Sequence, residues 1–291
     1  MRIDIGEFRL PPGEKVDFRK WPTRVKPFYQ TEKDYRNALM AGKEELSELQ
    51  KRLYASNEYA LLVIFQAMDA AGKDSAIKHV MSGVDPQGCQ VFSFKKPSGE
   101  ELKHDFLWRT NCRLPERGRI GIFNRSYYEE VLVVKVHPEF LRAQGFDPDR
   151  IKAKEFWRGR YQSIVDSENH LHRGKTRVVK FFLHVSKEEQ RKRLLSRIER
   201  PEKNWKFDIG DIQERDRWSD YMKAYEACLA ETGTELAPWY AIPADDKMNA
   251  RLIISRVLLD TLKGLKMRYP VLGMEKLKEL QRIRKLLEEQ A

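Results

Sequence analysis

Residues 61–75 read LLVIFQAMDAAGKDS, and this segment restricts the possible folds more than any other part of the chain. An apolar run from Leu61 to Phe65 is typical of a buried strand, and a helical pattern follows a short loop that carries Gly72 and Lys73. In such a loop, backbone N–H groups at the helix N-terminus bind an anion, and the lysine adds a positive charge. The segment therefore predicts a P-loop, the alternative being a turn with a surface lysine.

The loop departs from the common pattern G-x-x-x-x-G-K-[ST]. Ala67 stands at the first glycine, Asp74 replaces the Ser or Thr that binds Mg²⁺, and Asp69 lies inside the loop. A carboxylate repels phosphate unless a cation lies between them, so the loop predicts a site for both phosphate and Mg²⁺. We expect phosphate or nucleotide contacts from the remaining loop positions, which are Ala70, Ala71, Gly72, Asp74 and Ser75.

Length and composition limit the class of protein. The chain has 291 residues, of which 41% are hydrophobic and 34% charged, which suits one large α/β domain or two small ones. No apolar stretch approaches the ~20 residues of a membrane span, and the N-terminal MRIDIGEFRL lacks the apolar part of a signal peptide. The three cysteines are isolated and show no C-x-x-C spacing. We therefore expect a cytoplasmic protein without a membrane partner.

The net charge of +11 implies an anionic partner. Nucleic acid, a membrane surface and a phosphate-rich substrate all meet this condition, and charge alone does not choose among them.

Hydrophobic patterns predict alternating strands and helices along most of the chain. Strands are expected at 59–66, 88–94, 119–126, 177–185 and 239–244. Helices are expected after Thr31, at 73–81, 98–112 and 150–172, after Ser186, up to Glu231, and at 245–266 and 275–291. This alternation favours a parallel five-stranded sheet between helices. We divide the chain into an irregular arm (1–30), one domain (31–270) and a charged helical tail (271–291).

A second group of functional candidates follows the third expected strand, in IFNRSYYEE. In P-loop proteins an acidic residue at such a strand end holds the metal, and here Asn124 takes its place. Glu129 and Glu130 could supply the missing charge, and Arg125 is placed to reach phosphate because ligands bind at the carboxyl ends of parallel strands. The alternative is a capped turn with surface charges.

A third group lies in KEEQRKRLLSRIERPEKNWKF. Arg193 and Arg197 share a helix face, and Trp205 in the next, irregular stretch (200–212) is expected to be buried. A basic helix and loop after the fourth strand are typical of the lid of small-molecule kinases, which closes over a transferring phosphoryl group. We place this lid at about 193–215; a solvated helix face is the alternative. Further cationic phosphate-binding candidates are Lys95, Arg109, Lys203 and Lys206.

The motifs QAMDAAGKD, FNRSYYEEVLVV, FFLHVSKEEQRKRL, RPEKNWKF and APWYAIPAD, in this order, resemble the family-2 polyphosphate kinases over about 35–265. The resemblance implies a three-layer α/β/α, thymidylate-kinase-like P-loop fold and Mg²⁺-dependent phosphoryl transfer between inorganic polyphosphate and nucleotides. Asp69, Lys73 and Arg125 match residues of the family's site, as do the lid arginines Arg193 and Arg197. Asn followed by Y-x-E resembles the class III subgroup, which accepts nucleoside mono- and diphosphates; the resemblance assigns metal support to Glu129.

These observations lead us to expect a polyphosphate-dependent nucleotide kinase that converts AMP or ADP to ADP or ATP. The expected catalytic residues are Asp69, Lys73, Arg125, Glu129 and Arg193, with Asp69 and Glu129 as Mg²⁺ ligands. Adenine nucleotides are the first expectation and guanine nucleotides the second, in a homo-oligomer (dimer or tetramer) that binds no nucleic acid.

Three alternatives stay open. An ATP-dependent nucleoside or nucleotide kinase would share the fold, but Asp74 departs from its loop pattern. A nucleic-acid-binding P-loop protein would gather basic and aromatic residues in one stripe, whereas here the cations cluster at strand ends and in the lid. An inactive scaffold is disfavoured by Lys73 and the arginines.

Overall fold

A parallel five-stranded sheet forms the centre of the molecule in the computed structural model, which describes residues 3–147, 154–205 and 207–290. Its strand order is β2-β3-β1-β4-β5, and every pairing is parallel. The strands are β1 (Ala60–Gln66), β2 (Cys89–Ser93), β3 (Ile120–Asn124), β4 (Thr176–His184) and β5 (Trp239–Pro243). Their carboxyl ends therefore meet at one edge, where parallel sheets bind ligands. The predicted α/β fold with a five-stranded parallel sheet is confirmed.

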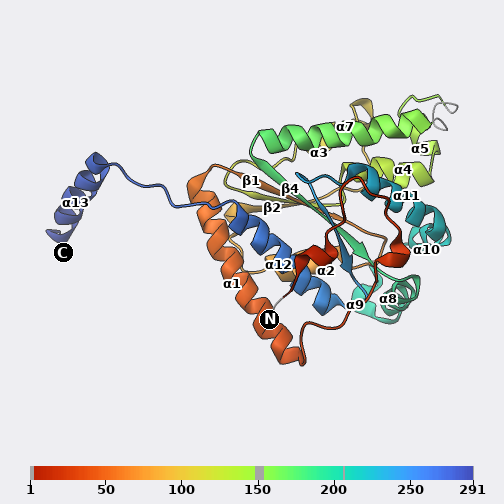
Figure 1. Cartoon of the computed structure of the whole chain (residues 1–291), viewed down its shortest axis with the longest axis horizontal. Coiled ribbons are helices and arrows are strands. Elements are labelled where there is room, and N and C mark those ends of the chain that lie inside the picture. Colours follow the sequence, from red (N-terminus) through yellow and green to blue (C-terminus); the bar gives the residue numbers. More distant parts are fainter. Residues whose placement is uncertain (1–2, 148–153, 206, 291) are drawn as a thin grey trace.

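Helices cover both faces of this sheet (Figure 1). One face carries α1, α2 and α12, which pack against one another, and α7 and α11 lie together over the other. The longer helices are α1 (Glu32–Ser56), α2 (Lys73–Met81), α7 (Lys154–Arg173), α8 (Lys187–Glu199), α11 (Trp218–Thr232), α12 (Lys247–Gly264) and α13 (Met274–Glu288). The short ones are α3 (Trp108–Asn111), α4 (Val133–Val136), α5 (Glu139–Ala143), α9 (Pro201–Asn204) and α10 (Gly210–Asp216).

The sequence explains this arrangement locally. All seven residues of β1 are buried, as continuous apolar strands are when helices cover both faces of a sheet. The helix predicted after Thr31 begins with a capping box, because Thr31 Oγ1 accepts from the Asp34 N–H at 3.1 Å and Asp34 Oδ2 accepts from the Thr31 N–H at 2.9 Å. Among the described residues, no helix combines the length and the apolar character that a membrane crossing needs.

The two ends of the chain behave differently. The N-terminal arm holds two 3-10 turns, η1 (Ile5–Phe8) and η2 (Phe18–Lys20), and buries Phe8, Leu10 and Val16 in the main core. It follows the outer strand, since the Leu10 N–H donates to the Trp239 carbonyl at 2.9 Å. By contrast, α13 projects from the body, and none of its residues is buried (Figure 1).

The single helix predicted at 98–112 is wrong. Ser98 and Glu101 do form a capping box, with N–H···O distances of 2.7 and 3.2 Å, but only the 3-10 turn η4 (Glu101–Lys103) follows it. His104 is extended, and Asp105 Oδ1 accepts from the Leu107 N–H at 2.9 Å in a new turn before α3. This side-chain bond competes with helix continuation.

Two expectations about the lid are also wrong. The stretch 200–212 is not irregular throughout, because α9 begins at Pro201, which is pre-set for a first helical position, and α10 begins at Gly210. Trp205 is 78% exposed rather than buried, and its indole N–H donates to the Glu202 carbonyl at 3.1 Å. The predicted helix start at Arg150 lies outside the described residues, and the described part of α7 begins at Lys154.

Candidate active site

The loop between β1 and α2 lies at the carboxyl edge of the sheet and has two residues in the left-handed backbone region. Ala70 has φ 60°, and Gly72 has φ 109°, a value that residues other than glycine rarely adopt. Gly72 directly precedes the first residue of α2, so its conformation sets the entry into the helix. The loop thus points backbone N–H groups of a helix N-terminus towards the edge where a phosphate would lie.

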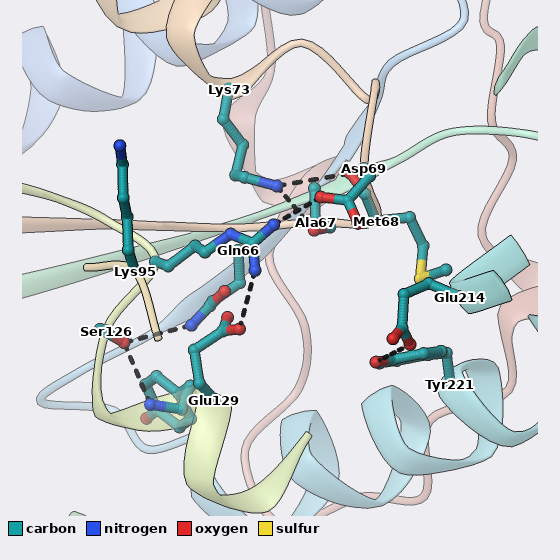
Figure 2. Close-up of polar contacts among 12 residues, drawn as sticks. Gln66, Ala67, Met68, Asp69, Lys73, Lys95, Ser126, Glu129, Glu214 and Tyr221 are labelled. Atoms are coloured by element: carbon teal, nitrogen blue, oxygen red, sulfur yellow. Dashed lines mark hydrogen bonds and ion pairs between the residues drawn. The ribbon is translucent and has the colours of Figure 1, made fainter. Parts of the chain in front are cut away.

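Lys73 extends back into this loop (Figure 2). Its ammonium group donates to the carbonyl oxygens of Ala67 at 2.7 Å and Met68 at 3.4 Å. Burial, together with the nearby Arg125 guanidinium, lowers the pKa of Lys73 from 10.5 to about 8. The lysine is therefore a poorly solvated cation that an arriving phosphate would stabilise.

Arg125 lies between two carboxylates. Its Nη2 donates to Asp69 Oδ1 at 2.5 Å, and its Nη1 donates to Glu129 Oε2 at 3.2 Å. Glu129, and to a lesser degree Asp69, raises the pKa of Arg125. The residue has φ 64°, a strained value for arginine, and its N–H donates to the Phe65 carbonyl at 3.0 Å. The structure thus brings together three of the predicted catalytic residues.

Asn124 and Glu130, the sequence neighbours of Arg125 and Glu129, have partners outside the Asp69–Arg125–Glu129 group. Asn124 Nδ2 donates to Asp74 Oδ1 at 2.5 Å and to Ser93 Oγ at 3.4 Å, so its amide nitrogen connects the end of β3 to the first turn of α2. Glu130 belongs with Glu129 to the 3-10 turn η5 (Tyr127–Val131), but it is buried and accepts from Arg160 Nη1 at 2.9 Å. Glu130 therefore supports the structure away from Arg125.

The two arginines of the predicted lid have distinct surroundings. Arg193 is buried and donates from Nη1 to the Ala71 carbonyl and from Nη2 to the Ala244 carbonyl, each at 2.5 Å. It thereby ties the phosphate loop to the end of β5. Arg197 Nη1 donates to Asp211 Oδ2 at 2.8 Å, which connects α8 to α10. Lys203 lies in α9, and Lys206 lies outside the described residues.

The two cations near β2 differ in exposure. Arg109 is buried, and its Nη1 donates to the Lys95 carbonyl at 2.7 Å while its guanidinium lies 5.6 Å from the centre of the Phe94 ring. Lys95 itself is exposed. Arg109 thus holds the chain after β2, and Lys95 is the more accessible of the two.

Sequence reasoning missed several polar residues near the loop. Gln190 Nε2 donates to the Asp69 carbonyl at 3.0 Å, and Arg251 Nη2 donates to Ser75 Oγ at 2.8 Å. A small cavity beside Gly72 is lined by Lys247 as well as Arg251. Lys247 is the first residue of α12, directly after β5. Because ligands bind at the carboxyl ends of parallel strands, the reasoning that singled out Arg125 after β3 would also have found Lys247.

A larger cavity of about 610 Å³ lies elsewhere, between the N-terminal arm and α11. Phe18, Trp21 and Trp218 line it, and no residue of the phosphate loop does. This cavity and the predicted phosphate site therefore do not coincide.

The donor set at Arg125 suits magnesium. Asp69 and Glu129 offer two carboxylates next to a phosphate loop, and Mg²⁺ in proteins is usually held by one or two carboxylates while water and substrate phosphates complete its shell. The described residues contain no group of three or more His, Cys, Asp or Glu side chains placed to hold a metal, so a site made only of protein ligands does not fit. In this structure both carboxylates accept hydrogen bonds from Arg125, so a bound metal ion would share them with the guanidinium group.

Comparison with known proteins places the chain in a family. The family described as "Polyphosphate kinase 2 (PPK2)" matches residues 29–270. The "ADP-polyphosphate phosphotransferase" of Rhodopseudomonas palustris is 59% identical and covers 99% of both chains. The "AMP/ADP-polyphosphate phosphotransferase" of Meiothermus ruber is 40% identical over 91% of this chain and 96% of its own. The crystal structure of polyphosphate kinase 2 from Arthrobacter aurescens TC1 has a TM-score of 0.85 and 37% identity, covering 96% of this chain and 95% of its own. The chain belongs to the polyphosphate kinase 2 family.

Proposed function

We propose that this protein is a polyphosphate-dependent nucleotide kinase that transfers a phosphoryl group from inorganic polyphosphate to ADP and to AMP. The observation that carries the proposal is the ion-paired group Asp69–Arg125–Glu129. It lies beside Lys73 and the loop after β1, whose shape suits phosphate binding. The names of the R. palustris and M. ruber relatives, which specify ADP and AMP/ADP as substrates, support the choice of acceptors.

Phosphoryl transfer requires positioning and charge neutralisation more than covalent participation by the protein. In our proposal, Lys73 and the loop amides bind the phosphate, and Arg125 turns from its carboxylates towards the oxygens of the transferring group. Arg193 keeps the loop in place through the Ala71 carbonyl. Bound Mg²⁺, held by Asp69 and Glu129, would neutralise charge on the phosphate oxygens.

The other cations would guide the polyanion. We propose that Lys95, Arg109, Arg197, Lys203 and Lys206 contact phosphate groups as the lid closes, and that the net charge of +11 speeds capture of polyphosphate at low salt. Residues 31–270 would form the catalytic unit, in a homo-oligomer that acts on adenine and, second, guanine nucleotides.

The test is synthesis of ATP from ADP, Mg²⁺ and purified polyphosphate as the sole donor, followed by luciferase luminescence. We expect ATP to form, ADP to form when AMP is the acceptor, and the apparent affinity for polyphosphate to fall as salt increases. Lys73→Ala serves as the control, with an expected loss of about 10²–10³-fold. No product from polyphosphate, together with efficient ATP-dependent phosphorylation of an acceptor, would show an ordinary nucleotide kinase instead.

A further inference from the structure

We infer that Gln66 is a positioning residue that holds Glu129 in place when Arg125 turns to the substrate. The inference rests on the proposed function. Gln66 is the last residue of β1 and fully buried, immediately before Ala67, whose carbonyl accepts from Lys73. It therefore lies between the two halves of the site, the phosphate loop after β1 and the turn η5 after β3.

The hydrogen bonds of the Gln66 amide define its role. Figure 2 shows the side chain between Ser126 and Glu129. When the amide nitrogen faces Glu129, it donates to Oε1 at 2.8 Å, and the amide oxygen accepts from Ser126 N at 3.2 Å and Ser126 Oγ at 3.3 Å. In the reverse orientation, which Figure 2 draws, the amide oxygen faces a carboxylate oxygen and only one bond forms, from the amide nitrogen to Ser126 Oγ. Hydrogen bonding therefore selects the first orientation.

Glu129 then has one donor for each carboxylate oxygen. Gln66 holds Oε1, and Arg125 holds Oε2 at 3.2 Å. The two donors differ in kind: Arg125 is charged and partly exposed, so phosphate competes for it, whereas Gln66 is neutral and buried, so phosphate does not. When Arg125 leaves, Gln66 keeps the carboxylate oriented for a metal.

The far side of Gln66 is firmly anchored. Ser126 is fully buried, and its Oγ accepts from the Tyr128 N–H at 3.2 Å. The Tyr128 hydroxyl in turn donates to Glu168 at 2.7 Å, and Lys180 donates to the same carboxyl group at 2.7 Å. Since all these groups are buried and bonded, the amide has little freedom to rotate. Hydrogen-bond partners of metal-binding side chains commonly change metal affinity by about 10–100-fold when removed.

The experiment is a double-mutant cycle on Mn²⁺ binding, with Mn²⁺ as a probe for the magnesium site. Gln66→Met, which keeps length and volume but has no amide, Glu129→Gln and the double variant are titrated in the presence of ADP, with free Mn²⁺ measured by electron paramagnetic resonance. We expect Gln66→Met to weaken binding by about 10-fold and to have no further effect once Glu129 is changed. Gln50→Met is the matched control, because Gln50 is 2% exposed and lies in α1; it should leave Mn²⁺ binding unchanged.

Circular dichroism and urea unfolding check that each variant is folded. If Gln66→Met does not fold, Gln66→Asn, which keeps the amide but is one methylene short, should show the same weakening. Unchanged Mn²⁺ binding in a folded Gln66 variant, or an equal loss with and without Glu129, would overturn the inference. Because the readout does not depend on turnover, failure of polyphosphate-driven ATP synthesis in the wild type would be seen separately.

Discussion

Replacing Lys73 with methionine should abolish turnover and yet leave the fold at least as stable at pH 7. The reason is the cost of keeping an ammonium group in the loop without its substrate. A fall in the pKa of Lys73 from 10.5 to about 8 corresponds to roughly 3 kcal/mol against the charged form. Methionine removes this cost but leaves the Ala67 carbonyl without its donor, at about 1–3 kcal/mol, whereas the Met68 carbonyl still accepts from the Ala71 N–H at 3.3 Å. We therefore expect a gain of about 0–2 kcal/mol in the free energy of unfolding.

The pH dependence separates this explanation from others. Below pH 8 wild-type Lys73 is protonated in both folded and unfolded chains, so the full cost is present. Between pH 8 and 10.5 the unfolded chain keeps a proton that the folded protein has lost, so wild-type stability rises with pH through this group. Lys73→Met lacks that rise. The difference in the free energy of unfolding between Lys73→Met and the wild type should therefore shrink as pH rises from 8 to 10.5.

Urea unfolding at pH 7, 8 and 9.5 measures these differences, and ATP synthesis from polyphosphate measures turnover. Polyphosphate with Mg²⁺ should raise the melting temperature of the wild type more than that of the variant, because a bound ligand stabilises only the state that binds it. A variant that loses several kcal/mol at every pH would refute the reasoning and make Lys73 a structural support of the loop.

Three further predictions concern the same site. First, kcat/KM for polyphosphate should fall as pH rises above about 8, because free Lys73 loses its charge there; a flat profile from pH 7 to 9.5 would contradict this. Second, Arg193→Lys should lower turnover more than nucleotide affinity, because one ammonium group cannot hold both carbonyls that the guanidinium holds, whereas Arg191→Lys on the exposed side of α8 should be silent in both assays. Third, Glu129→Gln should raise the Mg²⁺ concentration needed for half-maximal rate. Glu130→Gln should leave this concentration unchanged but destabilise the fold by about 3–5 kcal/mol, since it removes the buried counterion of Arg160. Equal magnesium requirements in the two variants would argue against Glu129 as a ligand.

Strand ends were the most informative positions in the sequence. The run before Lys73 and the run before Asn124 were predicted as strands, and the structure pairs them in parallel with Phe65 opposite Asn124. That register alone brings Arg125 to the phosphate loop. Both strands are buried along their whole length, and continuous apolar runs of this length are typical of such strands. The sequence therefore predicted these two elements well.

Local signals without a supporting pattern were less reliable. The Ser98 capping box exists, but a cap does not propagate a helix, because only packing of an apolar face maintains one. Amide side chains were also beyond sequence reasoning: nothing in the sequence tells which way Gln66 or Gln190 points. Lys180 was included in an apolar strand, and only the structure shows its 2.7 Å ion pair with Glu168.

The strained backbone of Arg125 and the desolvated ammonium group of Lys73 have different consequences for directed evolution. The left-handed conformation of Arg125 costs of order 1–3 kcal/mol, but its ion pairs with Asp69 and Glu129 offset this cost, and glycine would lose both pairs. Methionine at Lys73 relieves desolvation without losing an ion pair, so a library screened for heat resistance alone should enrich losses at Lys73 and yield stable but inactive proteins. Any thermostabilisation campaign on this chain needs an activity screen in every round.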